Sequence, residues 1–246
     1  MTTTGVADVS TSGFIPPTQR SWRVVRRGEP STALILDNEA PVPTLKSGEV
    51  LVRVQAVSFN NVYVSPLVSP TEHMVLTVPS VYFLMKLLPN SFVKRPAELE
   101  FAGEIVDAAS SSGFAPGDKV SGLITPDVHV RERRGALAQY IAVKPGELVK
   151  RPEFLSPVEA SGVLCVGLAA YQALFEVARL RQEPGQSVFI NGGSTSIGIY
   201  AIQLAKAYGL KVVASASGRN AKMVTELGAE VCTSYSYVVL QFLTRF

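Results

Sequence analysis

A glycine-rich segment is the part of this sequence best suited to bind a ligand. It runs from Asn191 to Gly198 (NGGSTSIG) and joins a short apolar stretch, 186–190, to a stretch with helical periodicity, 197–208. Glycines permit positive φ and close approach of the backbone, and the unpaired amides at a helix start attract anions. These properties predict a turn that binds a phosphate or pyrophosphate. Its residues are Gly192, Gly193, Ser194, Thr195, Ser196, Ile197 and Gly198.

The spacing of these glycines leaves a second interpretation open. It is not the GxGxxG fingerprint of dinucleotide folds. A helix dipole is present at every strand-to-helix turn, whether or not a ligand binds there. The segment is therefore also compatible with a tight turn that binds nothing.

A second polar group follows the next predicted strand, 211–214. Dinucleotide folds that take NAD normally have Asp or Glu here, which binds the ribose 2′-hydroxyl. This chain has no acid but offers the hydroxyls and guanidinium of 215–220, a combination suited to a 2′-phosphate. Ser217, Arg219 and Asn220 therefore predict NADPH in preference to NADH. The alternative is that Ser217 caps the following helix and Arg219 is merely solvated.

The surrounding elements predict an α/β chain with two parts. Residues 49–59 alternate apolar and polar side chains as a half-buried strand does, and further strands are expected at 101–108, 119–124 and 138–143. After Ser156 the pattern changes to a capped, buried helix reaching Arg179. It continues as strand 186–190, helix 197–208, strand 211–214 and helix 220–227. This order predicts a parallel sheet that binds ligands at the carboxyl ends of its strands.

Composition excludes several other classes. The chain has 246 residues, a net charge of +3, 47% hydrophobic and 17% charged residues, which is enough to build a real core. Two cysteines cannot form a disulfide framework, and no sustained basic run indicates nucleic-acid binding. The run Arg131-Glu132-Arg133-Arg134 is interpreted as a solvated loop. With neither a secretory signal nor a membrane-spanning stretch, a cytoplasmic location is expected, with a mitochondrial one weakly suggested by arginines at 20–27.

Several segments in order resemble the zinc-independent quinone oxidoreductase branch of the medium-chain dehydrogenase/reductases, which includes zeta-crystallin-like proteins and enoyl reductases. In the second part these are 190–198, 201–206, 217–220 and 227–229. In the first part they are 56–60, 100–106, 117–122 and 135–140. The resemblance implies an arm at 1–19, a GroES-like substrate domain at 20–155, and a partial NADP-binding, doubly wound (Rossmann) domain at 156–246.

The resemblance also implies an activity, namely hydride transfer from NADPH to a quinone, enone or enoyl-type substrate. Asn60 matches the asparagine near the nicotinamide and the substrate carbonyl. The 192–198 turn matches the pyrophosphate site, and Ser217 and Arg219 match the 2′-phosphate site. Zinc is not expected, because Phe59 and Leu99 occupy the positions of metal-binding Cys and His residues and neither can ligate a metal.

Other chemistry-bearing side chains are expected to be structural. His73 and His129 lie in segments that contain prolines and are interpreted as surface or hydrogen-bonded loop histidines. Cys165 lies in the apolar helix as a small core residue, and the carboxylates of 98–104 belong to a strand.

The chain departs from the family in four places. Thr195 stands where the family has a glycine, so a reshaped turn is expected if that position needs positive φ. Ala169 replaces a threonine that contacts the cofactor. Residues 64–81 look like an insertion, and 232–246 look foreign to a family whose cofactor domain has six strands. We hypothesise that both segments are translated intron sequence. The alternative function is then a truncated, catalytically inactive dinucleotide-binding or interaction module. Relatives dimerise through strands that this chain does not match.

Overall fold

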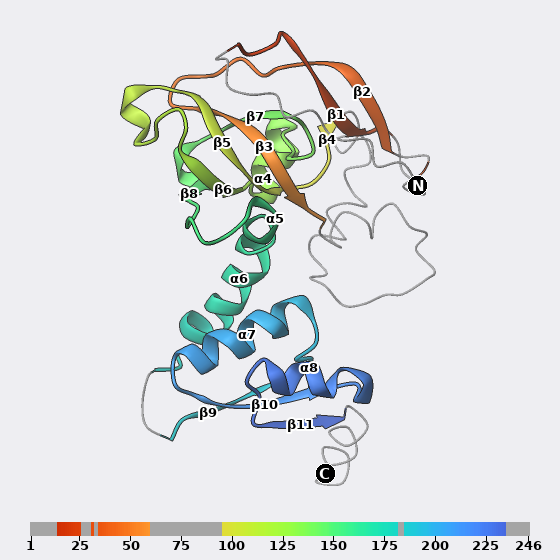
Figure 1. Cartoon of the computed structure of the whole chain (residues 1–246), viewed down its shortest axis with the longest axis vertical. Helices are drawn as coiled ribbons and strands as arrows, with labels where there is room; N and C mark the ends of the chain where they lie inside the picture. Colours follow the sequence, from red (N-terminus) through yellow and green to blue (C-terminus); the bar gives the residue numbers. More distant parts are fainter. Residues whose placement is uncertain (1–13, 26–30, 32–33, 60–94, 182–184, 235–246) are drawn as a thin grey trace. The chain divides into compact units, whose positions relative to one another are not determined.

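The computed structural model describes residues 14–25, 31, 34–59, 95–181 and 185–234 (Figure 1). The chain forms two compact units, Met1–Ser161 and Gly162–Phe246. The functional domain bounds expected from the sequence, 20–155 and 156–246, stay a prediction. No helix in the described ranges is both long and apolar enough to cross a bilayer.

The first unit is built on antiparallel strands, as the alternating sequence predicts. Its larger sheet has the strand order β7-β3-β5-β6-β8, and a smaller one has the order β2-β1-β4. The strands are β1 (Thr18–Val24), β2 (Leu34–Pro41), β3 (Val50–Ser58), β4 (Arg95–Pro96), β5 (Glu100–Ala108), β6 (Lys119–Leu123), β7 (Tyr140–Val143) and β8 (Leu148–Lys150). Among its described residues are also two short α-helices, α4 (Pro126–Glu132) and α5 (Pro157–Ala160), and two 3-10 turns, Ser110–Ser112 and Pro145–Glu147.

The core of this unit lies on the larger sheet. Strand β3 has neighbours on both edges, β5 and β7, and its first three residues, 50–52, are all buried. Phe101, Ile105 and Val120 from the adjoining strands fill the same apolar cluster. The half-buried strand expected at 49–59 is thus met from residue 53 onward, where the side chains are half-buried or exposed, while residues 50–52 are buried throughout.

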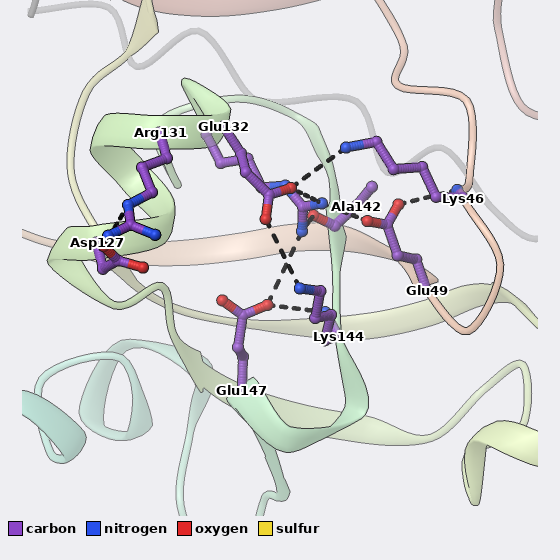
Figure 2. A network of polar contacts seen from close by, with 9 residues as sticks. Lys46, Glu49, Asp127, Arg131, Glu132, Ala142, Lys144 and Glu147 are labelled. Carbon is purple, nitrogen blue, oxygen red and sulfur yellow. Dashed lines mark hydrogen bonds and ion pairs between the residues drawn. The ribbon is translucent and has the colours of Figure 1, made fainter.

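A cluster of charged residues surrounds Arg134 in this unit. The guanidinium, 12% exposed, donates to Glu49, to Glu132 at 2.6 Å and to the carbonyl oxygen of Ala142 at 3.1 Å. Glu147 lies 3.9 Å from it. Figure 2 shows the carboxylates of the cluster with two lysines, Lys46 and Lys144, at its exposed side. The interpretation of 131–134 as a solvated loop is therefore wrong for Arg134, which pairs with Glu132 of the same run and with Glu49 and Glu147 from two other segments.

His129 matches the hydrogen-bonded alternative expected for it, but it lies on a helix and not in a loop. It belongs to α4, is fully buried, and its Nδ1 contacts the carbonyl oxygen of Arg134. Pro126 starts this helix at its first turn, where a missing N–H costs nothing, so proline here indicates a helix start and not a loop. His73 lies outside the described residues.

The second unit is a parallel sheet covered by helices. Its strands are β9 (Ser187–Ile190), β10 (Lys211–Ala216) and β11 (Val231–Ser234), in the order β11-β10-β9. Helices α7 (Ser196–Ala207) and α8 (Ala221–Glu226) connect them and pack on the sheet through one apolar cluster, which includes Ile202, Val212 and Val224 (Figure 1). The predicted order of strand, helix, strand and helix is confirmed, with bounds close to those expected.

The single buried helix expected over 156–179 is wrong. The capping box is present, with Ser156 Oγ accepting from the Glu159 amide at 3.2 Å, but α5 ends at Ala160. A second helix, α6 (Leu164–Tyr171), follows and leads into a π-helical turn over Gln172–Val177. An apolar helix is buried all round only if neighbours surround it. Leu168 and Tyr171 of α6 are 47% and 40% exposed, and Cys165 is half-buried.

Candidate functional site

Two polar segments meet at one edge of the parallel sheet. Strands β9 and β10 pair in register from Ser187 with Lys211 to Ile190 with Ala214. Because the strands are parallel, their carboxyl ends lie side by side, and the segments that follow them start at the same edge. The turn 191–195 follows β9, and the segment 217–220 follows β10. The structure thus places both predicted ligand-binding segments at the carboxyl edge of the sheet.

Gly192 provides the backbone conformation that the turn needs. Its φ is 84°, in the left-handed region that side chains rarely adopt. Its amide donates to Ser215 Oγ at 3.0 Å, and the amide of Gly193 donates to the carbonyl oxygen of Ser215 at 2.8 Å. The first half of the turn is therefore tied to the end of β10.

Thr195 does not strain the turn, because the condition for a reshaped loop, a positive φ at this position, is not met. Its φ of −76° and ψ of 160° are those of extended backbone, which a β-branched residue adopts freely. It is the N-cap of α7: its Oγ1 accepts from the Gly198 amide at 3.1 Å and donates to the carbonyl oxygen of Gly192 at 2.8 Å. The hydroxyl thus closes the turn, and the position does not require a glycine.

Gly198 permits the close approach of helix and turn. A Cβ at this position would lie 2.2 Å from the carbonyl oxygen of Gly192 and 2.8 Å from Cα of Gly193, both backbone atoms that cannot move aside cheaply. No side chain fits without displacing the helix start. The third glycine of the segment therefore fixes the distance between α7 and the end of β9.

The turn presents backbone amides and a positive helix end to the outside. Gly192, Gly193 and Gly198 are buried and Ser194 is half-buried, whereas Thr195, Ser196 and Ile197 are exposed. The amides of Ser196 and Ile197, in the first turn of α7, have no carbonyl within the helix to bond. Open amides at a helix N-terminus favour an anionic ligand.

The segment after β10 carries a cation at the same edge. Residues 218–220 form a short 3-10 turn that leads into α8, and Arg219 is exposed. Within the described ranges no salt bridge involves Arg219. Ser217 is half-buried and is the N-cap of this turn, but its side chain makes no capping hydrogen bond. The alternative interpretation is therefore wrong in the side-chain cap, whereas the exposed Arg219 agrees with its second part. Asn220, half-buried, is the N-cap of α8 without a side-chain cap bond.

The remaining predicted site residue is outside the described part of the chain. Asn60, expected near the reacting carbonyl, follows Phe59, which is exposed at the end of β3. Leu99 is buried in the core of the first unit. In the described ranges no three His, Cys, Asp or Glu side chains are grouped so that they could hold a metal.

The sequence interpretation missed one residue of this site. Ser215 was grouped with the hydroxyls that could meet a ligand, but it is fully buried and bonded to the glycine turn. The sequence signal that could have identified Ser215 is a serine at the end of a buried apolar strand, because a buried hydroxyl needs a hydrogen-bond partner.

No family model matches the chain. A chloroplastic quinone-oxidoreductase homologue of Spinacia oleracea is 31% identical over 201 residues, covering 80% of this chain and 55% of the relative. A trans-enoyl reductase of Aspergillus terreus is 28% identical over 232 residues, covering 90% of this chain and 60% of the relative. The chain thus spans a little over half the length of these relatives.

Among solved structures, the quinone oxidoreductase of Coxiella burnetii superposes with a TM-score of 0.72 at 28% identity, over 89% of this chain and 63% of that one. The fold, a β-rich unit followed by a parallel α/β unit with a glycine turn, is that of the quinone oxidoreductases within the alcohol dehydrogenase superfamily. In sequence and fold the chain is similar to the quinone oxidoreductases and, in sequence, to the trans-enoyl reductases, which confirms the resemblance and the fold class predicted from the sequence.

Proposed function

We propose that the chain is an oxidoreductase that binds NADPH and directs its hydride to a quinone, enone or enoyl-type substrate. The observation that carries the proposal is the glycine turn at 192–198, capped by Thr195, beside an arginine that has no ion pair among the described residues. The names of the relatives support the reaction class.

In this proposal the turn holds the pyrophosphate. The amides of Ser196 and Ile197 would donate hydrogen bonds to the pyrophosphate. Ser194 and the positive end of the α7 dipole would contribute to binding as well. The fit rests on the geometry of the turn itself: Gly198 brings α7 against the backbone of Gly192, and the Thr195 hydroxyl occupies the cap without blocking the amides that follow.

Ser217, Arg219 and Asn220 would select the phosphorylated cofactor. A guanidinium offers several donors to phosphate oxygens, and a hydroxyl and an amide beside it add neutral hydrogen bonds. NADH has a 2′-hydroxyl in place of the phosphate and would gain little from Arg219. The chain has no acid in 215–220 that would bind this hydroxyl and repel the phosphate.

The reacting end of the site is proposed on the resemblance. Asn60 would orient the carbonyl of the substrate by hydrogen bonding. Bound NADPH supplies the hydride, so the residues of the chain are needed for binding and orientation and no nucleophile is required.

The first experiment is a fluorescence titration of the purified 246-residue chain with NADPH and, separately, NADH. We expect saturable binding that prefers NADPH, and Arg219→Ala should raise the NADPH dissociation constant about tenfold or more, the size of a lost charge-assisted hydrogen bond. NADH binding should change less than about twofold. Arg20→Ala, which removes an exposed cation from β1, is the matched control and should leave both affinities unchanged.

Turnover is measured separately, as NADPH oxidation in the presence of a panel of quinones, enones and enoyl thioesters. Binding with turnover supports the oxidoreductase. Binding without turnover on any of these acceptors would favour a dinucleotide-binding module, and a folded chain that binds neither cofactor would overturn the proposal.

A further inference from the structure

Ser215 occupies a position between the two segments of the candidate site. It is residue five of β10 and is 0% exposed. Its hydroxyl donates to Asn191 Oδ1 at 2.6 Å and accepts from the Gly192 amide at 3.0 Å. Its backbone carbonyl accepts from the Gly193 amide at 2.8 Å. One residue of the second strand thus bonds three consecutive residues at the end of the first.

These bonds fix the peptide unit that opens the glycine turn. A hydroxyl can accept and donate at the same time, and Ser215 uses both capacities. The Gly192 amide is buried, so without this hydroxyl it has no partner in the site as it stands. Gly192 is held on its other side as well, because its carbonyl oxygen accepts from the Thr195 amide at 2.9 Å and from Thr195 Oγ1.

A continuous path of hydrogen bonds therefore connects β10 to the start of α7. It runs from Ser215 to Gly192, from Gly192 to Thr195, and from Thr195 to the Gly198 amide. The amides proposed to meet the pyrophosphate belong to the residues between Thr195 and Gly198. Their position depends on the conformation of Gly192, whose φ of 84° is one of several that a glycine can adopt.

We propose that Ser215 is a positioning residue, whose hydroxyl selects the binding-competent conformation of the 192–198 turn without touching the ligand. This inference rests on the proposed function, since the competent conformation is the one that binds the pyrophosphate of NADPH. Asn191 is the partner that orients the hydroxyl: by accepting the hydroxyl hydrogen, it leaves an oxygen lone pair directed at the Gly192 amide.

The first test removes the hydroxyl in the full chain. Ser215→Ala should make the Gly192 amide exchange with solvent at least about tenfold faster, while amides in the middle of α7 change less than about threefold. It should raise the NADPH dissociation constant about tenfold, the size of one lost hydrogen bond to a buried amide. Ser121→Ala is the matched control: Ser121 is a buried strand serine of the first unit, and its Oγ has no hydrogen-bond partner among the described residues.

Three further variants separate the effect of the hydroxyl from the effects of side-chain volume and charge. Ser215→Thr keeps the hydroxyl in a β-branched residue suited to a strand and should restore both Gly192 protection and NADPH affinity, whereas Ser215→Val should behave like Ser215→Ala. Asn191→Asp keeps an oxygen for the hydroxyl but adds a negative charge. It should retain Gly192 protection and still weaken NADPH binding.

The outcomes are distinguishable. Unchanged Gly192 exchange and affinity in Ser215→Ala, or equal losses in the Thr and Val variants, would overturn the positioning role. Faster exchange throughout α7 and β10 would assign Ser215 to general stability instead. If the wild-type chain binds no NADPH, the proposed function fails, and with it the role in cofactor binding, whereas the exchange data still decide whether Ser215 holds Gly192.

Discussion

The hydroxyl of Thr195 accepts a hydrogen bond from the amide of Gly198 at 3.1 Å, so the side chain that interrupts the glycine pattern is also the one that starts α7. A threonine at this point looks like a defect in a glycine motif when only the spacing is considered. In the folded chain it satisfies an amide that the helix leaves unpaired.

Thr195→Ala should destabilise the chain by about 1 kcal/mol, the usual cost of losing an N-cap hydroxyl. Thr195→Ser retains the hydroxyl and should remain within about 0.5 kcal/mol of the wild type. Urea denaturation followed by circular dichroism measures both free energies of unfolding. Equal stability of the Ala and Ser variants would show that the cap contributes nothing.

Gly198→Ala should destabilise by about 1–3 kcal/mol, because the added methyl would lie 2.2 Å from the carbonyl oxygen of Gly192. Gly146→Ala is the matched control, since a Cβ at Gly146 would meet nothing within 4 Å. The same denaturation experiment compares the two. If both variants unfold at the same urea concentration, the close approach of α7 to the turn is not as described.

Arg134→Met should destabilise the first unit by about 3–5 kcal/mol, because it leaves Glu49, 2% exposed, without its guanidinium partner. Arg131→Met removes an arginine three positions earlier whose pair with Asp127 is exposed, and it should cost about 0.5 kcal/mol or less. Thermal unfolding of the two variants checks the difference. A similar small loss in both would mean that the Arg134 cluster behaves like a surface ion pair.

Acid should weaken the same cluster through Glu132. Burial alone raises the pKa of this carboxyl, but the hydrogen bond from Lys46 and the charges of Arg134, Lys46 and Lys144 outweigh it and hold the pKa below its ordinary value. A carboxyl with a lowered folded-state pKa stabilises the protein above the unfolded pKa, and this contribution is lost as the pH falls through the folded value.

We therefore expect the free energy of unfolding to fall below about pH 4.5. Glu132→Gln should flatten that part of the pH profile, whereas Glu226→Gln, an exposed position on α8, should leave its slope unchanged. Urea midpoints measured between pH 3 and pH 7 test this, and a slope unaffected by Glu132→Gln would contradict the assignment.

The order of elements in the second unit could be predicted because each boundary has a local signal. Glycine follows both α7 and α8, and the glycine turn joins β9 to α7. The position of Arg219 after the second strand followed from the same order. These features depend on residues that are adjacent in sequence, so they can be predicted from one sequence.

The parts that could not be predicted depend on neighbours in space. Ser215 meets Asn191 only because β9 and β10 pair in that register. Arg134 is only partly exposed because Glu49, 85 positions away in sequence, and the carbonyl of Ala142 in β7 approach it. The segment 156–179 is apolar around its circumference, which predicts a buried helix. How many other elements cover α6 cannot be predicted from the periodicity of that segment alone.

The register of the two parallel strands has a practical consequence for redesign. The hydrogen bonds that hold the glycine turn end at Ser215, and in the described part of the chain none of them involves residues 217–220. The anchoring of the turn is thus separate from the discrimination that we propose for 217–220 at the ribose. If 217–220 select NADPH as proposed, a graft that replaces them with an acid-bearing loop is expected to shift the selectivity toward NADH while leaving the scaffold of the turn intact.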